Sequence, residues 1–307
     1  MLQFLANVRT ARMPCPHRAS ASHSIQVNFD EYCQQKAVPP GSSSYYALRE
    51  APAGRRPLLT ALFALRREFE ETVKETSDPA IGRTKLAWWQ KEIAALAAGA
   101  PSHPVSKALA AHLGGGAKAM EAEYPALQTL LAGFEMDLDQ ARYLDYPNLR
   151  RYLQGVGGTF ATLTARATAR NPAQAAAWAA PLGEAMLLAQ LVAELGNDAR
   201  HGRIYIPVDE MQRFNVTAAD VINRKYSDAF TELIRFQTKR AREALTAALA
   251  AMPADEQRTQ RTLRAQAALA LALLDEIERD GYHVLHQSIA LTPIRKLWVA
   301  WRGARRR

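Results

Sequence analysis

The chain has 307 residues, of which 48% are hydrophobic, so it can bury a sizeable core and lacks the composition of a disordered protein. Its net charge of +9 leaves an anionic lipid or an anionic small molecule as candidate partner, because the dispersed basic residues lack the interleaved aromatic residues of a nucleic-acid-binding motif. Its only cysteines, Cys15 and Cys33, exclude a disulfide framework and a cysteine-based zinc site.

The N-terminal segment 1–24 contains several serines and three arginines but no acidic residue. This composition is typical of an organellar transit peptide, which would place a eukaryotic protein in the mitochondrial matrix. In a bacterial chain the same segment would be a poorly ordered extension or an upstream start, and the protein would be cytoplasmic with peripheral contact to the inner membrane. We therefore expect an N-terminal extension (1–28), one domain (29–302) and a basic tail (303–307).

The apolar residues of the first part of the domain recur at helical spacing. A short helix is expected over 29–36 and ends at the Pro-Pro-Gly sequence of 39–41. A long helix is expected over 58–76 because one face of it is apolar. The residues of that face are Leu59, Leu62, Phe63, Leu65, Phe69 and Val73. The sequence Ser-Asp-Pro at 77–79 then supplies a cap and a first-turn proline for the next helix.

The second part of the domain also consists of helical patterns. Loops at 99–104 and 112–118 bound a short helix. The further helices are expected at about 125–142, 147–169, 172–198, 207–213, 217–250 and 255–302, and Asp, Gly or Pro residues are expected to interrupt the fifth and the last of them. No apolar run approaches the roughly 18 residues that span a bilayer. Long amphipathic helices with short connections predict an all-α bundle, with one extended segment at Ile204–Ile206.

The C-terminal segment combines apolar and basic side chains. Its apolar residues are Leu297, Trp298, Val299 and Trp301, and its basic residues are Arg302, Arg305, Arg306 and Arg307. This pairing suits contact with a membrane interface. The alternative is a frayed terminus that is solvated on all sides.

The stretch Ala185–Pro207 joins an apolar helix to a polar cluster. Glu194 and Asp198 lie four residues apart, so one helix face carries both carboxylates, with Asn197 beside them. Such a pair can share a Mg²⁺ ion, which proteins commonly hold with one or two carboxylates and the phosphates of a substrate. The alternative is a solvated helix end without a ligand.

These residues and four other stretches resemble the squalene/phytoene synthase family. The second aspartate-rich motif of that family is similar to ELGNDARHGRIYIPVDEMQRF. Its bacterial presqualene diphosphate synthase branch is similar to EYCQQKAVPPGSSSYYALRE, KLAWWQKEIAAL, MDLDQARY and LLDEIERDGYHVLHQSIALTPIRKLW. The likeness covers roughly residues 30–302. The chain also resembles the mitochondrial complex I assembly factor that carries a squalene/phytoene synthase domain.

The resemblance implies an isoprenoid (terpenoid) synthase-like helical bundle around a central cavity. Active members join two prenyl diphosphates head to head, and two acidic helix faces hold Mg²⁺ across that cavity. The resemblance assigns substrate binding to Arg67, Tyr45, Tyr46, Tyr152, Gln190, Arg203 and Tyr205. It assigns metal binding to Glu70, Glu71, Glu194 and Asp198, and it assigns no catalytic residue.

Several positions depart from the motifs of active members. The first motif of the family reads close to Tyr-x-x-x-Arg-x-x-Asp-Asp-x-x-Asp, whereas this chain has Glu70 and Glu71 for the Asp pair and Lys74 for the last Asp. A lysine repels Mg²⁺ and is placed to pair with the glutamate four residues before it. The other replacements are Phe63 for Tyr, Gln190 for Asn, Ala193 for Arg, Glu194 for Asp and Asn197 for Glu.

Two hypotheses follow from this combination. The first is a divergent, catalytically impaired member that keeps the cavity and binds a prenyl diphosphate, another isoprenoid lipid or a partner protein, as a non-catalytic assembly factor would. The second is an active presqualene diphosphate, squalene or phytoene synthase that uses glutamates as Mg²⁺ ligands. Under either hypothesis, Glu70, Glu71, Glu194 and Asp198 should face one another across the cavity.

Overall fold

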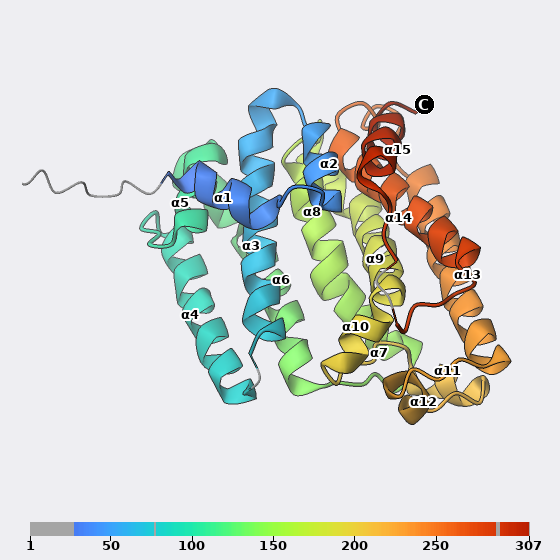
Figure 1. The fold of residues 1–307 in the computed structure, drawn as a ribbon. Helices are drawn as coiled ribbons and strands as arrows, with labels where there is room; N and C mark the ends of the chain where they lie inside the picture. The colour runs from blue at the N-terminus through green and yellow to red at the C-terminus, as the bar shows by residue number, and fades with distance from the viewer. Residues whose placement is uncertain (1–27, 77, 287–288, 307) are drawn as a thin grey trace, which may run out of the picture.

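The computed structural model describes residues 28–76, 78–286 and 289–306, and every regular element in these ranges is helical (Figure 1). The predicted all-α fold is confirmed. The elements are α1 (Phe29–Ala37), α2 (Ser43–Arg49), η1 (Ala53–Arg55), α3 (Arg56–Lys74), α4 (Pro79–Ala97), α5 (Pro104–His112), α6 (Gly116–Asp139), α7 (Tyr146–Tyr152), η2 (Leu153–Gly158), α8 (Thr159–Arg166), η3 (Pro172–Gln174), α9 (Ala175–Ala193), α10 (Leu195–Arg200), α11 (Val208–Arg213), α12 (Ala218–Ile222), α13 (Asp228–Ala250), α14 (Arg261–Arg279) and α15 (Pro293–Arg305). The transit-peptide prediction and Arg307 of the basic tail fall outside the described residues.

Helix α9 lies in the middle of the bundle. It packs against η2, α8, α13 and α14, while α3 packs against α1, α5 and α6. Figure 1 shows the long helices side by side, with α4 at one side and α13 at the other. The short helices α10, α11 and α12 gather at one end of the bundle, and α2 and α15 lie toward the other.

Polar side chains cap the starts of α1 and α4, and the cap of α4 was expected from the sequence. The side chain of Asn28 accepts a hydrogen bond from the backbone N–H of Asp30 and so begins α1. Asp78 does the same for α4 at 2.8 Å, with Pro79 in the first turn. Both helices therefore begin where the polar cap residues indicate.

From the sequence, no apolar run was expected to approach the length that spans a bilayer, and the helix that contains α9 corrects this expectation. The segment Pro172–Ala193 is long and apolar enough to span a bilayer by length and composition, with a mean hydropathy of 1.3. Within the bundle 61% of the apolar 18-residue window of that segment is buried, because helices pack on several of its sides. A helix that is apolar all round is expected in the core of a large helical domain, and α9 is such a helix.

Several helix boundaries differ from those expected. Helix α6 begins at Gly116, earlier than the start at about residue 125 that was expected from the sequence, and it continues through Pro125. Three successive glycines with positive φ, Gly114 to Gly116, mark the true break. The expected helix over 172–198 is divided at Glu194, because α9 ends at Ala193 and α10 begins at Leu195. The segment Ile204–Ile206 forms one bridge to Arg142 and, within the described ranges, no strand.

Two glycines allow η2, a π-helical segment, to lie directly against α9. A Cβ atom on Gly183 would come within 2.1 Å of the backbone oxygen of Gly157, and one on Gly157 would come within 2.5 Å of that of Gly183. No side chain fits at such distances, so the two backbones set how closely these elements approach. Both glycines also line the cavity described below.

Helix α15 presents an apolar stripe to solvent. Its large exposed residues recur at helical spacing and are Ile294, Leu297, Trp298 and Trp301. Ile294 is 82% exposed and Trp298 is 53% exposed, and the rings of Trp298 and Trp301 are contacted by the guanidinium groups of Arg302 and Arg305 on the same helix. The opposite face is held in place, because Ala300 and Ala304 are buried against α14 and α2.

We predict that Gly183→Ala destabilises the fold by about 1–3 kcal/mol, because the added methyl group overlaps the backbone of Gly157. The measurement is urea or thermal unfolding followed by circular dichroism. Gly54→Ala is the matched control, since a Cβ atom there meets nothing within 4 Å. Equal stability of the two variants would contradict the close approach of η2 and α9.

Candidate functional site

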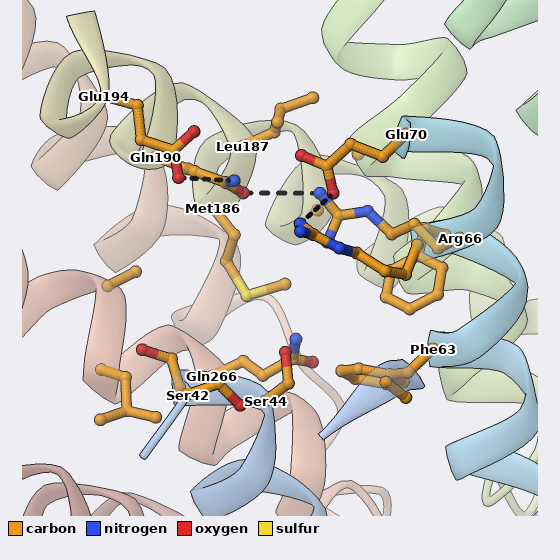
Figure 2. A pocket seen from close by; sticks show the side chains of 18 of the residues that line it. Ser42, Ser44, Phe63, Arg66, Glu70, Met186, Leu187, Gln190, Glu194 and Gln266 are labelled. Carbon is orange, nitrogen blue, oxygen red and sulfur yellow. Dashed lines mark hydrogen bonds and ion pairs between the residues drawn. The ribbon is translucent and has the colours of Figure 1, made fainter. Parts of the chain in front are cut away.

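A cavity of about 410 Å³ opens between the α1–α2 connection, α3, η2, α8, α9 and α14. Its apolar part is lined by Phe63, Phe160, Met186, Leu187, Leu269 and Leu273. Figure 2 shows Arg66, Glu70, Gln190 and Glu194 together at one end, and Ser42, Ser44 and Gln266 at the other. The cavity thus combines an apolar middle with two polar ends, as an elongated amphiphilic ligand would require.

Beside the first polar end, Lys74 holds an acidic centre together. Its ammonium Nζ lies 3.0 Å from Oε1 of Glu70 on its own helix. It also lies 3.4 Å from Oε2 of Glu194 and 3.7 Å from Oδ1 of Asp198. The lysine ends α3, and the two carboxylates come from the junction of α9 and α10. One cation therefore bridges the two acidic segments.

The pKa values in this centre follow from its burial and its charges. Burial alone would lower the pKa of Lys74, but Glu70, Glu194 and Asp198 raise it above its ordinary value. Burial would raise the pKa of Glu70, yet the nearby cations, Arg66 first and then Lys74, hold it below its ordinary value. Burial raises the pKa of Asp198 to about 7, and Lys74 offsets this only in part. The Oδ2 atom of Asp198 has no hydrogen-bond partner, which is consistent with incomplete compensation.

These residues do not fit a Mg²⁺ cluster. Within the described ranges, no three His, Cys, Asp or Glu residues are arranged so that they could hold a metal ion. The point where Glu70, Glu194 and Asp198 converge is already the position of the Lys74 ammonium. A divalent ion there would meet strong repulsion from a fixed positive charge a few ångströms away. The lysine takes the place that a metal would need.

Glu71 lies apart from the other acidic residues. It pairs with Lys36 and, at 2.7 Å, with Nε of Arg67. Neither interaction reaches Lys74, and Glu71 does not line the cavity. The expectation that all four acidic residues face one another is therefore wrong for Glu71, because two cations on its own side of the helix hold its carboxylate. Arg67 lines the cavity, but its guanidinium forms ion pairs with Glu70 and Glu71.

Tyr152, Tyr205 and Arg203 support the site instead of lining it. The hydroxyl groups of Tyr152 and Tyr205 donate hydrogen bonds of 2.9 and 2.8 Å to the two carboxylate oxygens of Asp137. Burial raises the pKa of Asp137 to about 6, although both hydrogen bonds act in the opposite direction. Arg203 donates to the backbone oxygens of Val73 and Asp137. This buried network joins the end of α3 to α6 and to the segment after α10.

Tyr45 and Tyr46, which the resemblance assigns to substrate binding, are also not among the residues that line the cavity. Tyr46 is buried against α14 and α15, and the hydroxyl of Tyr45 accepts a hydrogen bond from Arg49. The helix that carries them does reach the cavity, but through Ser43 and Ser44 at its start. Of the residues assigned to substrate binding by resemblance, Arg67 and Gln190 line the cavity.

Sequence comparison missed Arg66 and Gln266. Arg66 stands beside the motif arginine, yet it follows Phe63 by three residues and precedes Glu70 by four, which places all three on one helix face. Gln266 comes from α14, outside every motif. Both line the cavity, and each has a buried polar atom without a partner, Nε of Arg66 and Oε1 of Gln266. The helical spacing could have identified Arg66, whereas nothing in the sequence distinguishes Gln266.

Comparison with known proteins supports the resemblance seen in the sequence. The family model described as squalene/phytoene synthase matches residues 38–296. A phytoene synthase of Arthrospira platensis is 29% identical, over 91% of this chain and 92% of its own. A 15-cis-phytoene synthase of Synechococcus elongatus is 27% identical, over 92% of this chain and 93% of its own.

Solved structures share the fold. A dehydrosqualene synthase in complex with a ligand superposes with a TM-score of 0.77 at 19% identity, covering 90% of this chain and 95% of its own. A squalene synthase from Alicyclobacillus acidocaldarius superposes with a TM-score of 0.69, also at 19% identity, covering 83% and 94%. At this identity the likeness concerns the arrangement of helices.

We predict that Lys74→Met lowers the free energy of unfolding by about 2 kcal/mol near pH 8, between the values typical of exposed and buried ion pairs. Without the ammonium, the pKa values of Glu70 and Asp198 should rise in the folded state, because Lys74 lowers both. The folded state then favours the neutral acids, so stability is lost as pH rises and the deficit should shrink toward pH 5. Denaturant unfolding across this pH range measures the effect.

Mg²⁺ in the millimolar range should raise the melting temperature of Lys74→Met, because a divalent ion can then bind the vacated carboxylates of the folded state. The original chain and the charge-preserving Lys74→Arg variant should not respond. An equal response of all three proteins would mean that Lys74 does not stand in the place of a metal.

Proposed function

The chain belongs to the squalene/phytoene synthase family, and we propose that it is a member that binds an isoprenoid lipid in its cavity without Mg²⁺-dependent prenyl transfer. The observation that carries this proposal is the position of the Lys74 ammonium between Glu70, Glu194 and Asp198. The cavity and its apolar lining support binding. The charge arrangement opposes metal-assisted chemistry.

The chemistry of the family explains why a fixed ammonium is a poor substitute for Mg²⁺. Ionisation of a prenyl diphosphate leaves a highly charged diphosphate, and divalent ions neutralise it by binding several of its oxygens. The positive charge of Lys74 is already matched by three carboxylates, so little of it remains for a leaving group. The first step of the family reaction thus lacks its main driving interaction.

The competing function is an active head-to-head prenyltransferase with glutamates as metal ligands. The full-length similarity to phytoene synthases favours it. It would require Lys74 to leave the acidic centre when substrate and metal bind. The two functions differ in one measurable respect, which is turnover with Mg²⁺.

We predict Mg²⁺-insensitive, weak binding of farnesyl diphosphate and no product formation. Calorimetric titration measures the binding, and product analysis by mass spectrometry measures the chemistry. Turnover at ordinary enzyme rates, roughly 1 per second or faster, would contradict the proposal.

Restoring the family pattern tests the cause of this loss. The repaired chain carries Glu70→Asp, Glu71→Asp, Lys74→Asp, Gln190→Asn, Ala193→Arg, Glu194→Asp and Asn197→Glu. It should release diphosphate from a prenyl diphosphate in the presence of Mg²⁺. The matched control contains all of these changes except Lys74→Asp and should stay inactive. Activity of the control would show that the lysine is not the block.

We also propose that α15 lies on an anionic membrane, at the inner membrane of a bacterium or in the matrix of a mitochondrion. Its exposed stripe of Leu297, Trp298 and Trp301 would enter the interface. A groove of about 690 Å³ beside the stripe is lined by Arg302 and Arg306, among other residues. Anionic lipid head groups would therefore meet positive charge directly beside the apolar surface.

We predict that Trp298→Ser with Trp301→Ser weakens binding to vesicles that contain an anionic phospholipid, as measured by co-sedimentation. Since each nearby basic residue is worth about 1 kcal/mol at such a surface, binding should also fall as salt is added. The control is Trp88→Ser, because Trp88 is similarly exposed, at 45%, but lies on α4. Unchanged binding by the double variant, or binding without salt dependence, would exclude this surface.

A further inference from the structure

Among the described residues that line the cavity, Arg66 is the cation that makes no ion pair with a carboxylate, although Glu70 lies near enough to feel its charge. Among the described residues, Lys36 pairs with Glu68 and Glu71, and Arg67 pairs with Glu70 and Glu71. No ion pair joins Arg66 to a carboxylate in that part of the chain. The Nη2 atom of Arg66 donates one long hydrogen bond of 3.4 Å to Gln190, and its Nε is buried without a partner. A guanidinium has five N–H donors in a planar fork, so most of its bonding capacity is unused.

The guanidinium lies at the boundary between the polar and the apolar parts of the cavity. Its carbon Cζ lies 5.0 Å from the centre of the Phe160 ring, within the range of a cation–π contact. Phe160 in turn packs edge to face against Phe63, with ring centres 4.9 Å apart. Figure 2 shows Arg66 reaching from α3 toward Gln190, with Met186 and Leu187 alongside. A ligand held by Arg66 would therefore have apolar residues along its chain.

The carboxylates at the same end limit the charge that a ligand can bring. Glu70 and Glu194 also line the cavity, and they would repel a diphosphate that has no metal ion beside it. A carboxylate carries one negative charge and matches the guanidinium fork with two parallel hydrogen bonds. The local charge thus favours a head group with a single charge.

We infer that Arg66 binds the carboxylate of a long-chain lipid acid, whose apolar chain lies between Phe63, Phe160 and Met186. The inference rests on the proposed function in so far as the cavity must bind a lipid, and it adds the head group and the residue that recognises it. Gln190 holds the guanidinium in place from the opposite side. Gln266 lies at the far end of the cavity, where it could bind a polar group at the distal end of the lipid.

The same residue would oppose prenyl transfer independently of Lys74. The carbocation that the family reaction forms would pass through the apolar middle of the cavity. A fixed positive charge at its edge, over the ring of Phe160, would raise the energy of that cation. A cation that opposes carbocation chemistry is well suited to holding an anion.

The test is calorimetric titration of the full chain with farnesoic acid, farnesol and farnesyl diphosphate, all without metal. Farnesoic acid should bind more tightly than the other two. Arg66→Met, which removes the charge and keeps most of the volume, should weaken farnesoic acid binding by about tenfold or more and leave farnesol within about twofold. Arg66→Lys should recover part of the loss. Arg83→Met, which removes a surface arginine paired with Asp139, is the control.

The outcomes separate this inference from the proposed function. Equal binding of farnesol and farnesoic acid, or loss of affinity in Arg67→Met instead of Arg66→Met, would overturn the role of Arg66 and leave an isoprenoid-binding cavity. Palmitate is the second arm, because a fatty acid carries the same head group. Binding of palmitate alone would support Arg66 and overturn the isoprenoid part of the proposed function. Absence of binding by every probe would overturn both.

Discussion

The ion-pair cluster around Lys74 is the interaction on which the arrangement of the site depends. Three carboxylates cannot be brought together near a buried helix junction without a positive charge among them. In this chain that charge is tethered to α3, so it is present at every metal concentration and holds α3 against the junction of α9 and α10. The backbone contacts of Arg203 and the tyrosine hydrogen bonds to Asp137 reinforce the same corner. The acidic centre is therefore complete as the chain folds.

The fold could be predicted from the sequence because its signals are local. Apolar spacing identified α3, and Asp78 with Pro79 identified the start of α4. The misplaced boundary of α6 shows the limit of that method. The helix was expected from about residue 125, but α6 begins directly after Gly114 and Gly115 and continues through Pro125. Glycine and proline residues show where a helix can begin or end, and the packing of the folded chain determines which of these positions is the actual boundary.

The site was predictable only in part, because it depends on contacts between distant segments. The pair of Lys74 and Glu70 follows from their spacing, whereas the contacts of Lys74 with Glu194 and Asp198 exist only in the folded chain. Motif comparison directs attention to matched positions such as Arg67. The structure shows that its unmatched neighbour Arg66 also lines the cavity and, unlike Arg67, makes no ion pair among the described residues. A motif points to the arginine at the matched position, whereas helical geometry shows which of two adjacent arginines shares a face with Phe63 and Glu70.

The contact between η2 and α9 limits how this protein can change in evolution or engineering. At Gly157 and Gly183 the cavity wall is backbone, so no truncation can deepen it there, and any larger residue forces the helices apart. Adaptation to longer or shorter ligands must therefore come from lining positions that carry side chains, such as Phe63, Phe160 and Met186. The contact of Gly157 with Gly183 is a fixed part of the cavity wall, and variation in ligand length is confined to the rest of the lining.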